Sequence, residues 1–230
     1  MHTIATSLQQ VHQRLTQACQ QAGRAPDAVT LLAVSKTFGP DAVAQAFAAG
    51  QRAFGENYIQ EAVEKIALLR HLPLQWHCIG PVQSNKTRLV AENFDWVHTV
   101  DRLKIAQRLS EQRPPSLPPL QLCIQVNVDG GTTKSGVAPQ EALALAQQVA
   151  ALPQVRLRGL MCIPESAPNF IAACAVFTRA RGIFNALNAE GLTLDTLSMG
   201  MSADLEAAVL EGSTLVRVGT AIFGGRPAVA

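Results

Sequence analysis

One lysine stands out among the residues whose type and position could do chemistry. Residues 30–34 form a short apolar run, and Lys36 follows this run after one serine. If the run is a buried strand, the lysine stem leaves it inside an apolar mouth, where desolvation lowers the pKa of an amine toward neutrality. Such an amine is a competent Schiff-base nucleophile. The alternative is a lysine that reaches the rim or pairs with a carboxylate such as Glu56, and position alone favours neither interpretation.

A second group of residues, far along the chain, suits an anion. Residues 198–204 join an expected strand to an expected short helix with Ser202 as its N-cap, and free backbone N–H groups at a helix start favour an anion. Residues 217–220 add Gly219 and Thr220 at the next strand end, which suits a backbone nest. Either piece alone is better explained as an ordinary capped turn or a buried strand. Together, opposite a candidate Schiff-base lysine, they point to a phosphorylated aldehyde, and pyridoxal 5′-phosphate (PLP) fits that description.

These side chains need a framework that brings them to one place. Apolar residues from Ile4 to Ala22, at three- and four-residue spacing, predict an amphipathic helix that stops at Gly23. Strands are then expected at 30–34, 52–55, 75–79, 95–99, 121–126, 157–161, 195–198 and 214–218. Helices are expected at 41–49 and near 58–70, 85–92, 102–112, 140–151, 170–189 and 203–210. This alternation favours an α/β fold, a (β/α)8 TIM barrel with an extra N-terminal helix, in which functional groups sit at the C-terminal ends of the strands.

The whole chain, residues 1–230, is expected to form one domain. Its length is slightly below the ~250 residues that are typical of this barrel. The proline-rich stretch at 113–119 is too short for a domain boundary and fits a stiff connection into the fifth strand. A doubly wound open sheet is the alternative fold, but no G-x-G-x-x-G motif follows the first strand.

The composition argues against several classes of protein. The 48% hydrophobic and 16% charged residues argue against disorder. The net charge of +2 gives no indication of a surface that binds nucleic acid or an anionic membrane. Its five cysteines form no C-x-x-C pair, which favours reduced thiols over a disulfide framework or a zinc site. The first residues lack a signal-peptide pattern, and no apolar run approaches the ~18–20 residues of a membrane span. We therefore expect a cytoplasmic protein.

A set of short motifs stands along the chain in a fixed order and carries a family resemblance. The motifs are Ala33-Val34-Ser35-Lys36-Thr37, Phe54-Gly55-Glu56-Asn57-Tyr58, Trp76-His77-Cys78-Ile79-Gly80, Gln83-Ser84-Asn85-Lys86, Lys134-Ser135-Gly136, Gly159-Leu160-Met161, Ser198-Met199-Gly200-Met201-Ser202-Ala203-Asp204 and Arg217-Val218-Gly219-Thr220-Ala221-Ile222-Phe223-Gly224. Together they resemble the pyridoxal phosphate homeostasis protein family, also called the YggS or proline-synthetase co-transcribed family. The resemblance runs from the first helix to the last strand. Cys78 and Cys162 depart from the pattern, and neither bears on the aldimine.

The resemblance implies a fold-type III barrel like the N-terminal domain of alanine racemase, with PLP as its cofactor and no metal. It makes Lys36 the residue in aldimine linkage with PLP. It places Ser202, Gly219 and Thr220 around the phosphate and sets Arg217 against the pyridine nitrogen.

The same resemblance adds residues around this site. It places Asn57 and Asn85 in the pocket lining, with Asn57 the better supported, and brings the chain at Ser198 and Met199 close to the phosphate. It puts His77 at the barrel mouth, where the alternative is a core histidine with satisfied ring nitrogens. Polar strand ends or rim charges are expected at three further positions: Lys86, His98 and Lys134.

The chemistry expected of this site is binding with little or no catalysis. A permanent cation at the pyridine nitrogen disfavours ring protonation and weakens the ring as an electron sink. A two-base racemase also needs a proton carrier opposite the lysine, which alanine racemase takes from a tyrosine supplied with its second domain. The chain ends six residues after Gly224 and holds one tyrosine, Tyr58.

The resemblance therefore implies a PLP carrier that stores and hands over the cofactor in the cell as a monomer or weak dimer. PLP-dependent apo-enzymes are the candidate recipients, and neither nucleic acid nor a membrane is an expected partner. One alternative is an amino-acid racemase of the alanine racemase type, which uses Lys36 with His77 or Cys78. Another is a cofactor-free aldolase barrel, in which Lys36 attacks a sugar phosphate directly.

Overall fold

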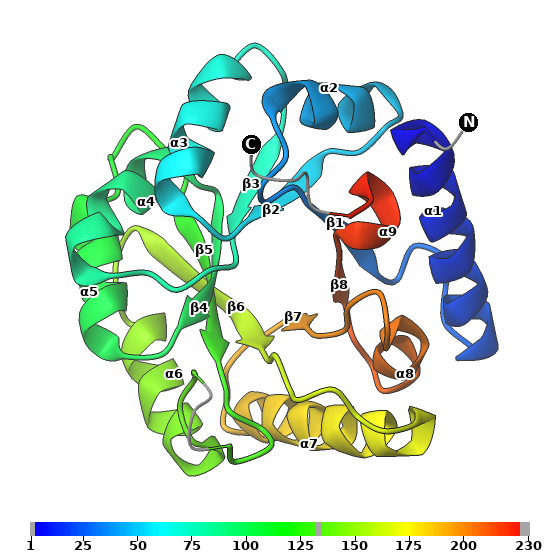
Figure 1. Ribbon diagram of the computed structural model, residues 1–230. Helices are drawn as coiled ribbons and strands as arrows, with labels where there is room; N and C mark the ends of the chain where they lie inside the picture. The colour runs from blue at the N-terminus through cyan, green and yellow to red at the C-terminus, as the bar shows by residue number, and fades with distance from the viewer. Residues whose placement is uncertain (1–2, 132–134, 226–230) are drawn as a thin grey trace.

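The computed structural model describes residues 3–131 and 135–225, and its strands form one closed parallel barrel in the order β1 to β8 (Figure 1). The strands are β1 (Thr30–Val34), β2 (Ala53–Glu56), β3 (Gln75–Cys78), β4 (Trp96–Val100), β5 (Leu120–Gln125), β6 (Val155–Met161), β7 (Thr196–Ser198) and β8 (Leu215–Val218). β1 pairs with β8 as well as with β2, so the sheet has no open edge. The expected (β/α)8 barrel is confirmed, and the open sheet is wrong.

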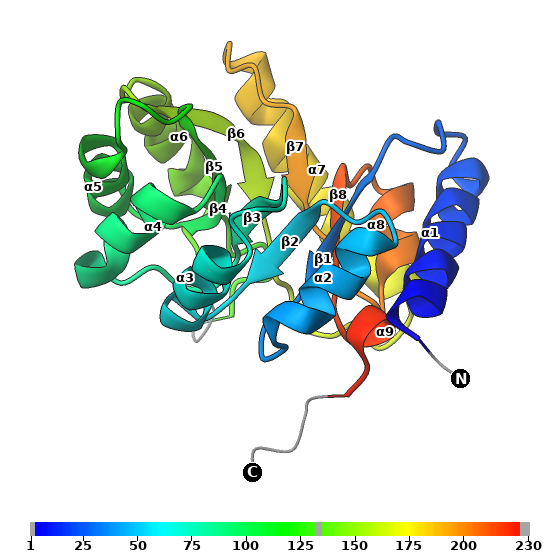
Figure 2. The ribbon, with the colours of Figure 1, turned by 90° about the horizontal axis from the view of Figure 1, so that it is seen from above.

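Helices cover the outside of this barrel and connect its strands in turn (Figure 2). They are α1 (Ile4–Gln21), α2 (Pro40–Ala48), α3 (Ile59–Leu68), α4 (Thr87–Asn93), α5 (Leu103–Gln112), α6 (Ala142–Ala150), α7 (Phe170–Ala189), α8 (Leu205–Leu210) and α9 (Thr220–Phe223), with 3-10 turns η1 (Ser84–Lys86) and η2 (Pro139–Glu141) before α4 and α6. The expected boundaries of the strands agree with these to within two residues. The 3-10 turns explain why the expected starts of two helices fall before α4 and α6.

The extra N-terminal helix has a structural role. The helix that follows β8, α9, is only four residues long and leaves the wall between β8 and β1 thinly covered. α1 packs against α2, α8 and α9 and so takes the position of a full eighth helix (Figure 1). It is amphipathic, and its buried residues are Leu8, Val11, Leu15, Ala18 and Cys19.

Alternation along β1 sets which side chains point into the barrel. Leu31 and Ala33 belong to the apolar layer between strands and helices, whereas Leu32 and Val34 belong to a separate buried cluster with residues of β2 and β8 and with Ile79, which follows β3. Side chains two residues apart lie on the same face of a strand. Continuing this alternation past the end of β1 sends Ser35 outward and Lys36 inward.

α7 carries a feature that the sequence analysis did not anticipate. It is the one helix in the described residues that is long and apolar enough, by length and composition, to cross a membrane. It also carries Arg179 and Arg181, and its residues Ala173 and Phe177 are buried against the barrel core. Packing onto β6 and α8 therefore accounts for the buried apolar side chains of this helix, whereas Phe170 and Ile171 near its start are exposed.

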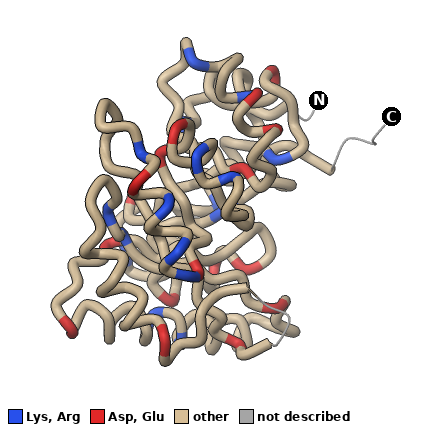
Figure 3. The backbone as a smooth tube through the Cα atoms, turned by 90° about the vertical axis from the view of Figure 1, so that its left-hand side faces the viewer, with Lys and Arg blue, Asp and Glu red and all other residues tan. Residues whose placement is uncertain are grey.

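Charged residues of both signs are spread over the described chain. Figure 3 shows Lys and Arg positions interspersed with Asp and Glu positions along the backbone. This distribution accords with the small net charge of +2.

Candidate functional site

A cavity of about 370 Å³ opens where the strands end at their C-terminal side. Its lining comes from the ends of β1, β2, β3, β6, β7 and β8 and from the segments that follow them. The lining residues are Val34, Lys36, Asn57, Ile79, Ile163, Met201, Ser202, Ala203, Arg217, Gly219 and Thr220. The structure thus brings together six residues expected at one site from separate parts of the sequence. We call this space the mouth cavity.

Lys36 enters the mouth cavity without a carboxylate partner among the described residues. The alternative pairing with Glu56 does not occur, because Glu56 lies on the outer face of β2, where Lys65 Nζ donates to its Oε1 at 2.7 Å. Ser35 Oγ donates to the same oxygen at 2.6 Å. Strand parity therefore separates Glu56 from Lys36 and leaves the amine directed at the cavity.

The turn that carries Lys36 is strained and braced from outside the barrel. Thr37 has a φ of 68°, in the left-handed region that costs a residue with a Cβ about 1–2 kcal/mol. Its N–H donates to Glu61 Oε1 at 2.9 Å. Lys65 is 3% exposed and donates to both Glu61 Oε1 (3.1 Å) and the carbonyl oxygen of Ser35 (3.0 Å). These contacts from α3 hold the backbone on both sides of Lys36.

Arg217 supplies a buried cation to the mouth cavity from β8, the strand that pairs with β1. It is 4% exposed, its Nη1 donates to Ser198 Oγ at 2.7 Å, and its Nη2 donates to the carbonyl oxygen of Cys162 at 2.8 Å. Burial lowers the pKa of Arg217, but a guanidinium keeps its proton in proteins. No described carboxylate forms an ion pair with it. The lining of the cavity thus includes a positive charge that no described carboxylate neutralises.

The expected anion loops lie at the rim, with one correction. Ser202, Gly219 and Thr220 all line the mouth cavity. However, Ser202 is not the N-cap of α8: that position is Asp204, whose carboxylate accepts from the N–H of Met201 at 2.6 Å. The helix begins later than expected because residues 202–204 form a turn.

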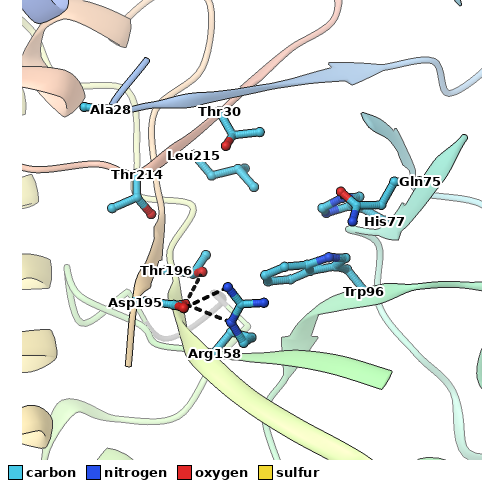
Figure 4. A pocket seen from close by; sticks show the side chains of 10 residues that line it. All are labelled: Ala28, Thr30, Gln75, His77, Trp96, Arg158, Asp195, Thr196, Thr214 and Leu215. Atoms are coloured by element: carbon cyan, nitrogen blue, oxygen red, sulfur yellow. Dashed lines mark hydrogen bonds and ion pairs between the residues drawn. The ribbon is translucent and has the colours of Figure 1, made fainter. Parts of the chain in front are cut away.

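Three predicted site residues lie away from the mouth cavity. Asn85 is exposed in η1 and is not part of the lining. Met199 is fully buried in the outer apolar layer and is not part of the lining. His77 does not line the barrel mouth: it lies deep in the barrel and borders a second cavity of about 320 Å³ at the N-terminal ends of the strands, which we call the floor cavity (Figure 4). Its ring nitrogens face His98 and Gln75, so the alternative, a core histidine with satisfied nitrogens, is the correct one.

The remaining expected residues divide between interior and rim. Ser198 is fully buried directly below Arg217 and contacts it through its hydroxyl, so it reaches the site only through that arginine. His98 is also interior rather than a polar strand end at the mouth. Lys86 lies in η1, and Lys134 lies outside the described residues.

Several residues of the site had not been anticipated. Arg14 of α1 donates to the carbonyl oxygen of Ser202 at 2.8 Å and forms two bonds of 2.5 and 2.6 Å to Glu206. It thereby ties the N-terminal helix to an anion loop, and no local motif marks it. Apolar cavity walls come from Ile79 and Ile163, which strand parity could have indicated.

The residues present fit PLP on observations of the cavity itself. The Oδ1 atom of Asn57 is buried at the lining without a hydrogen-bond partner among the described residues. Buried acceptors normally receive a hydrogen bond, so this oxygen is available to a bound ligand. A primary amine, a guanidinium and an apolar wall face the same space. This set suits a flat aldehyde with a ring nitrogen and an anionic end.

Comparison with known proteins gives consistent results. The family described as the alanine racemase N-terminal domain matches residues 6–227. A curated pyridoxal phosphate homeostasis protein of Pseudomonas aeruginosa is 60% identical over 226 residues, which cover 98% of this chain and 97% of that protein. PipY of Synechococcus elongatus, solved with PLP bound, is 40% identical with a TM-score of 0.82 and covers 96% of this chain and 100% of its own. An alanine racemase of Corynebacterium glutamicum, 20% identical with a TM-score of 0.68, shares the fold, with 99% of this chain matched to 62% of that one.

Proposed function

The chain belongs to the alanine racemase N-terminal domain family and, within it, to the pyridoxal phosphate homeostasis proteins. From this premise we propose that it binds PLP at the mouth cavity and takes part in PLP homeostasis. One observation of the structure carries the proposal. Among the described residues that line this cavity, only Lys36 and Arg217 are ionisable, and neither is neutralised by a carboxylate. Two cations facing one space suit a ligand that combines an aldehyde with a phosphate.

Each lining residue has a distinct task in this proposal. PLP, when bound, supplies an aldehyde carbon that condenses with a primary amine and releases water. Lys36 presents that amine from the end of β1. Ser202, Gly219 and Thr220 would hold the phosphate, and Arg217 would donate a hydrogen bond to the ring nitrogen. Ile79 and Ile163 would supply apolar walls that exclude water.

The same geometry favours a carrier over a racemase. Stereochemical inversion needs a second proton carrier across the substrate from Lys36. His77 lies at the floor, and Cys78 points into the outer core, where burial raises the pKa of its thiol to about 12. Tyr58 is 51% exposed and precedes α3. None of these three lines the mouth cavity, so PLP held there would be stored and transferred.

PLP-dependent apo-enzymes are the recipients in this proposal, and the cytoplasm is the compartment. The rim of the mouth cavity is open, and Met201 on its edge is 39% exposed, so a bound cofactor can leave without unfolding of the barrel. All five cysteines are free, as a reducing compartment requires.

Titration with PLP tests the proposal. The wild-type protein is expected to take up one PLP per chain and to gain a yellow absorption band. Lys36→Ala should lose the band, whereas Lys86→Ala, which removes a lysine of η1 outside the cavity, should keep it. The loaded protein should then restore activity to a PLP-free aminotransferase. A wild-type protein that stays colourless and binds a keto sugar phosphate instead would support the aldolase alternative.

A separate measurement decides between carrier and racemase. Loaded protein is incubated with L-alanine in D2O, and the loss of the α-proton signal is followed by NMR. A carrier exchanges this proton no faster than free PLP does. Fast, stereospecific exchange that disappears in Lys36→Ala would favour the racemase.

A further inference from the structure

A chain of side-chain hydrogen bonds runs through the barrel interior from the mouth cavity to the floor cavity. Arg217 Nη1 donates to Ser198 Oγ at 2.7 Å, and Ser198 Oγ lies 2.9 Å from His98 Nδ1. His98 Nε2 lies 2.8 Å from His77 Nδ1, and His77 Nε2 lies 3.0 Å from Gln75 Oε1. The five side chains come from β8, β7, β4 and β3. Figure 4 shows the floor end, with Gln75 beside His77.

One orientation of hydrogens satisfies every group in this chain. A guanidinium can only donate, so the Ser198 oxygen accepts and its hydrogen is free to go to His98 Nδ1. His98 then carries its hydrogen on Nε2 and donates to His77, which in turn donates through its own Nε2 to Gln75 Oε1. The reverse orientation would leave the Ser198 hydroxyl hydrogen without an acceptor in the chain. All the bonds therefore point from Arg217 toward Gln75.

Burial keeps the two imidazoles in the neutral form that this orientation requires. His77 is 1% exposed and His98 is fully buried. Burial lowers the pKa of His77 to about 3 and that of His98 well below its usual value. A protonated imidazole donates from both nitrogens and would break the head-to-tail order. The chain thus contains one charge, that of Arg217.

Packing at the floor fixes the lower end of the chain. The rings of His77 and Trp96 stack with centroids 5.2 Å apart and planes at 7°. The guanidinium of Arg158 lies over the Trp96 ring at 4.8 Å and forms two hydrogen bonds of 2.8 Å to Asp195 (Figure 4). His77 therefore cannot turn without displacing a stacked and ion-paired layer.

We infer that Ser198, His98 and His77 are positioning residues that hold the Arg217 guanidinium against the ring nitrogen of the proposed cofactor. This inference rests on the proposed function. A carboxylate would also fix an arginine, but it would cancel the positive charge that the site uses. A neutral, one-directional chain orients the guanidinium and leaves both its charge and its free N–H groups available to the cavity.

Removal of the Ser198 hydroxyl tests the hydrogen-bond chain with little change in side-chain volume. Ser198→Ala breaks the link between Arg217 and His98. The matched control is Ser213→Ala, since Ser213 is equally buried on the neighbouring segment but donates only to backbone carbonyl oxygens, such as that of Met199 at 2.7 Å. Both variants lose a buried hydroxyl, so a purely structural effect should appear in both. Their thermal unfolding without PLP measures that effect.

The distinguishing readout is the ¹⁵N NMR resonance of PLP labelled at its ring nitrogen. Ser198→Ala and His98→Leu should shift this resonance and weaken PLP binding about tenfold, the size expected for a lost hydrogen bond to a charged group. Ser213→Ala should leave both unchanged. His98→Gln should restore both, because an amide can accept from Ser198 and donate to His77.

The outcomes separate this inference from the proposed function. If the wild type loads PLP but the resonance in Ser198→Ala stays at the wild-type position, the positioning role is overturned and the proposed function stands. If the wild type takes up no PLP at all, both are overturned. A shift that appears equally in Ser213→Ala would also overturn the positioning role, because it would reflect general loosening of β7 and β8.

Discussion

Arg217 makes its two side-chain hydrogen bonds to neutral acceptors, Ser198 and the carbonyl oxygen of Cys162. A buried cation is normally placed beside a carboxylate, because desolvation of an unpaired charge is unfavourable. Here the charge faces the mouth cavity, and a bound ring nitrogen would accept a hydrogen bond from it. Since a cation disfavours protonation of that nitrogen, the residue suits a site that holds PLP more than one that drives its chemistry.

The two buried histidines, His77 and His98, should make the stability of the protein depend on pH. The pKa of His77 falls from 6.5 to about 3 on folding because the ring is buried, and the pKa of His98 falls for the same reason. Between about pH 6.5 and 3 the unfolded chain binds protons that the folded chain does not. The free energy of unfolding should therefore fall as the pH falls through this range, by up to about 1.4 kcal/mol per pH unit for each histidine. Urea denaturation at pH 7.5, 6 and 5 measures this slope.

A double variant identifies the source of the slope. His77→Gln combined with His98→Gln should unfold with a shallower dependence on pH. His71→Gln, which replaces an exposed histidine before β3, should leave the wild-type slope unchanged. A wild-type stability that is flat from pH 6.5 to 5 would contradict buried neutral imidazoles.

Gly200 is required where β7 leaves the barrel. Its φ is 97°, and a Cβ at this position would lie 2.4 Å from the Cβ of Ala208 in α8. Gly200→Ala should lower the free energy of unfolding by about 2–4 kcal/mol, from strain and overlap together. Gly182→Ala is the control, because a Cβ at this position in α7 meets nothing within 4 Å and alanine favours a helix by up to about 1 kcal/mol. Thermal or urea unfolding of both variants checks the difference, and equal stabilities would contradict the close approach of α8.

At the scale of elements, α1 serves the site as well as the core. Arg14 links it to the carbonyl oxygen of Ser202 and to Glu206, whose pKa the arginine holds below its usual value. Arg14→Leu should release this loop and weaken PLP binding about fivefold, which corresponds to about 1 kcal/mol. The loss of overall stability should be no larger, since the pair is more than a third exposed and screened by solvent.

The matched control for this variant lies on α4. Arg88 forms a 3.7 Å pair with Glu92 on an exposed surface and does not line the mouth cavity. Arg88→Leu should change neither PLP binding nor stability measurably. Equal binding by wild type and Arg14→Leu in a PLP titration would show that α1 does not support the loop.

α3 braces the Lys36 turn through a buried charge cluster. Lys65 donates to Glu56 and Glu61, and Glu61 accepts from the N–H of Thr37. Lys65→Met should lower the free energy of unfolding by about 3–5 kcal/mol, because it leaves the buried Glu56 carboxylate without its cation. Adding Glu56→Gln to this variant should recover part of the loss. Urea unfolding of the two variants checks this, and no recovery in the double variant would contradict the pairing.

At the scale of the whole molecule, the sequence was sufficient for the barrel and for most of the mouth cavity. Short apolar runs such as 30–34 are typical of strands buried on both faces, and their alternation with helical segments predicts a closed parallel sheet. Because strand ends meet at one rim, Lys36, Ser202, Gly219 and Thr220 were expected together, and the family resemblance added Asn57 and Arg217. All six line one cavity.

Residues that depend on long-range contacts were beyond this reasoning. Arg14 meets the β7–α8 segment only because α1 takes the position of a full helix beside the short α9. His77 was expected at the mouth because β3 ends nearby, but its position within β3 places it near the floor. Ser202 is not the N-cap as expected, because residues 202–204 form a turn and α8 begins only at Leu205. Tertiary packing sets the position of Arg14, whereas the place along the strand and a local turn set those of His77 and Ser202.

The most direct test of a PLP site centred on Lys36 is reduction of the loaded protein with borohydride, followed by peptide mapping. Borohydride fixes the bond between the amine and the cofactor. We predict that the yellow band bleaches and that the adduct maps to the peptide containing Lys36, with none at Lys65 or Lys86. An adduct at another lysine, or no adduct in protein that had been saturated with PLP, would contradict the assignment of the mouth cavity.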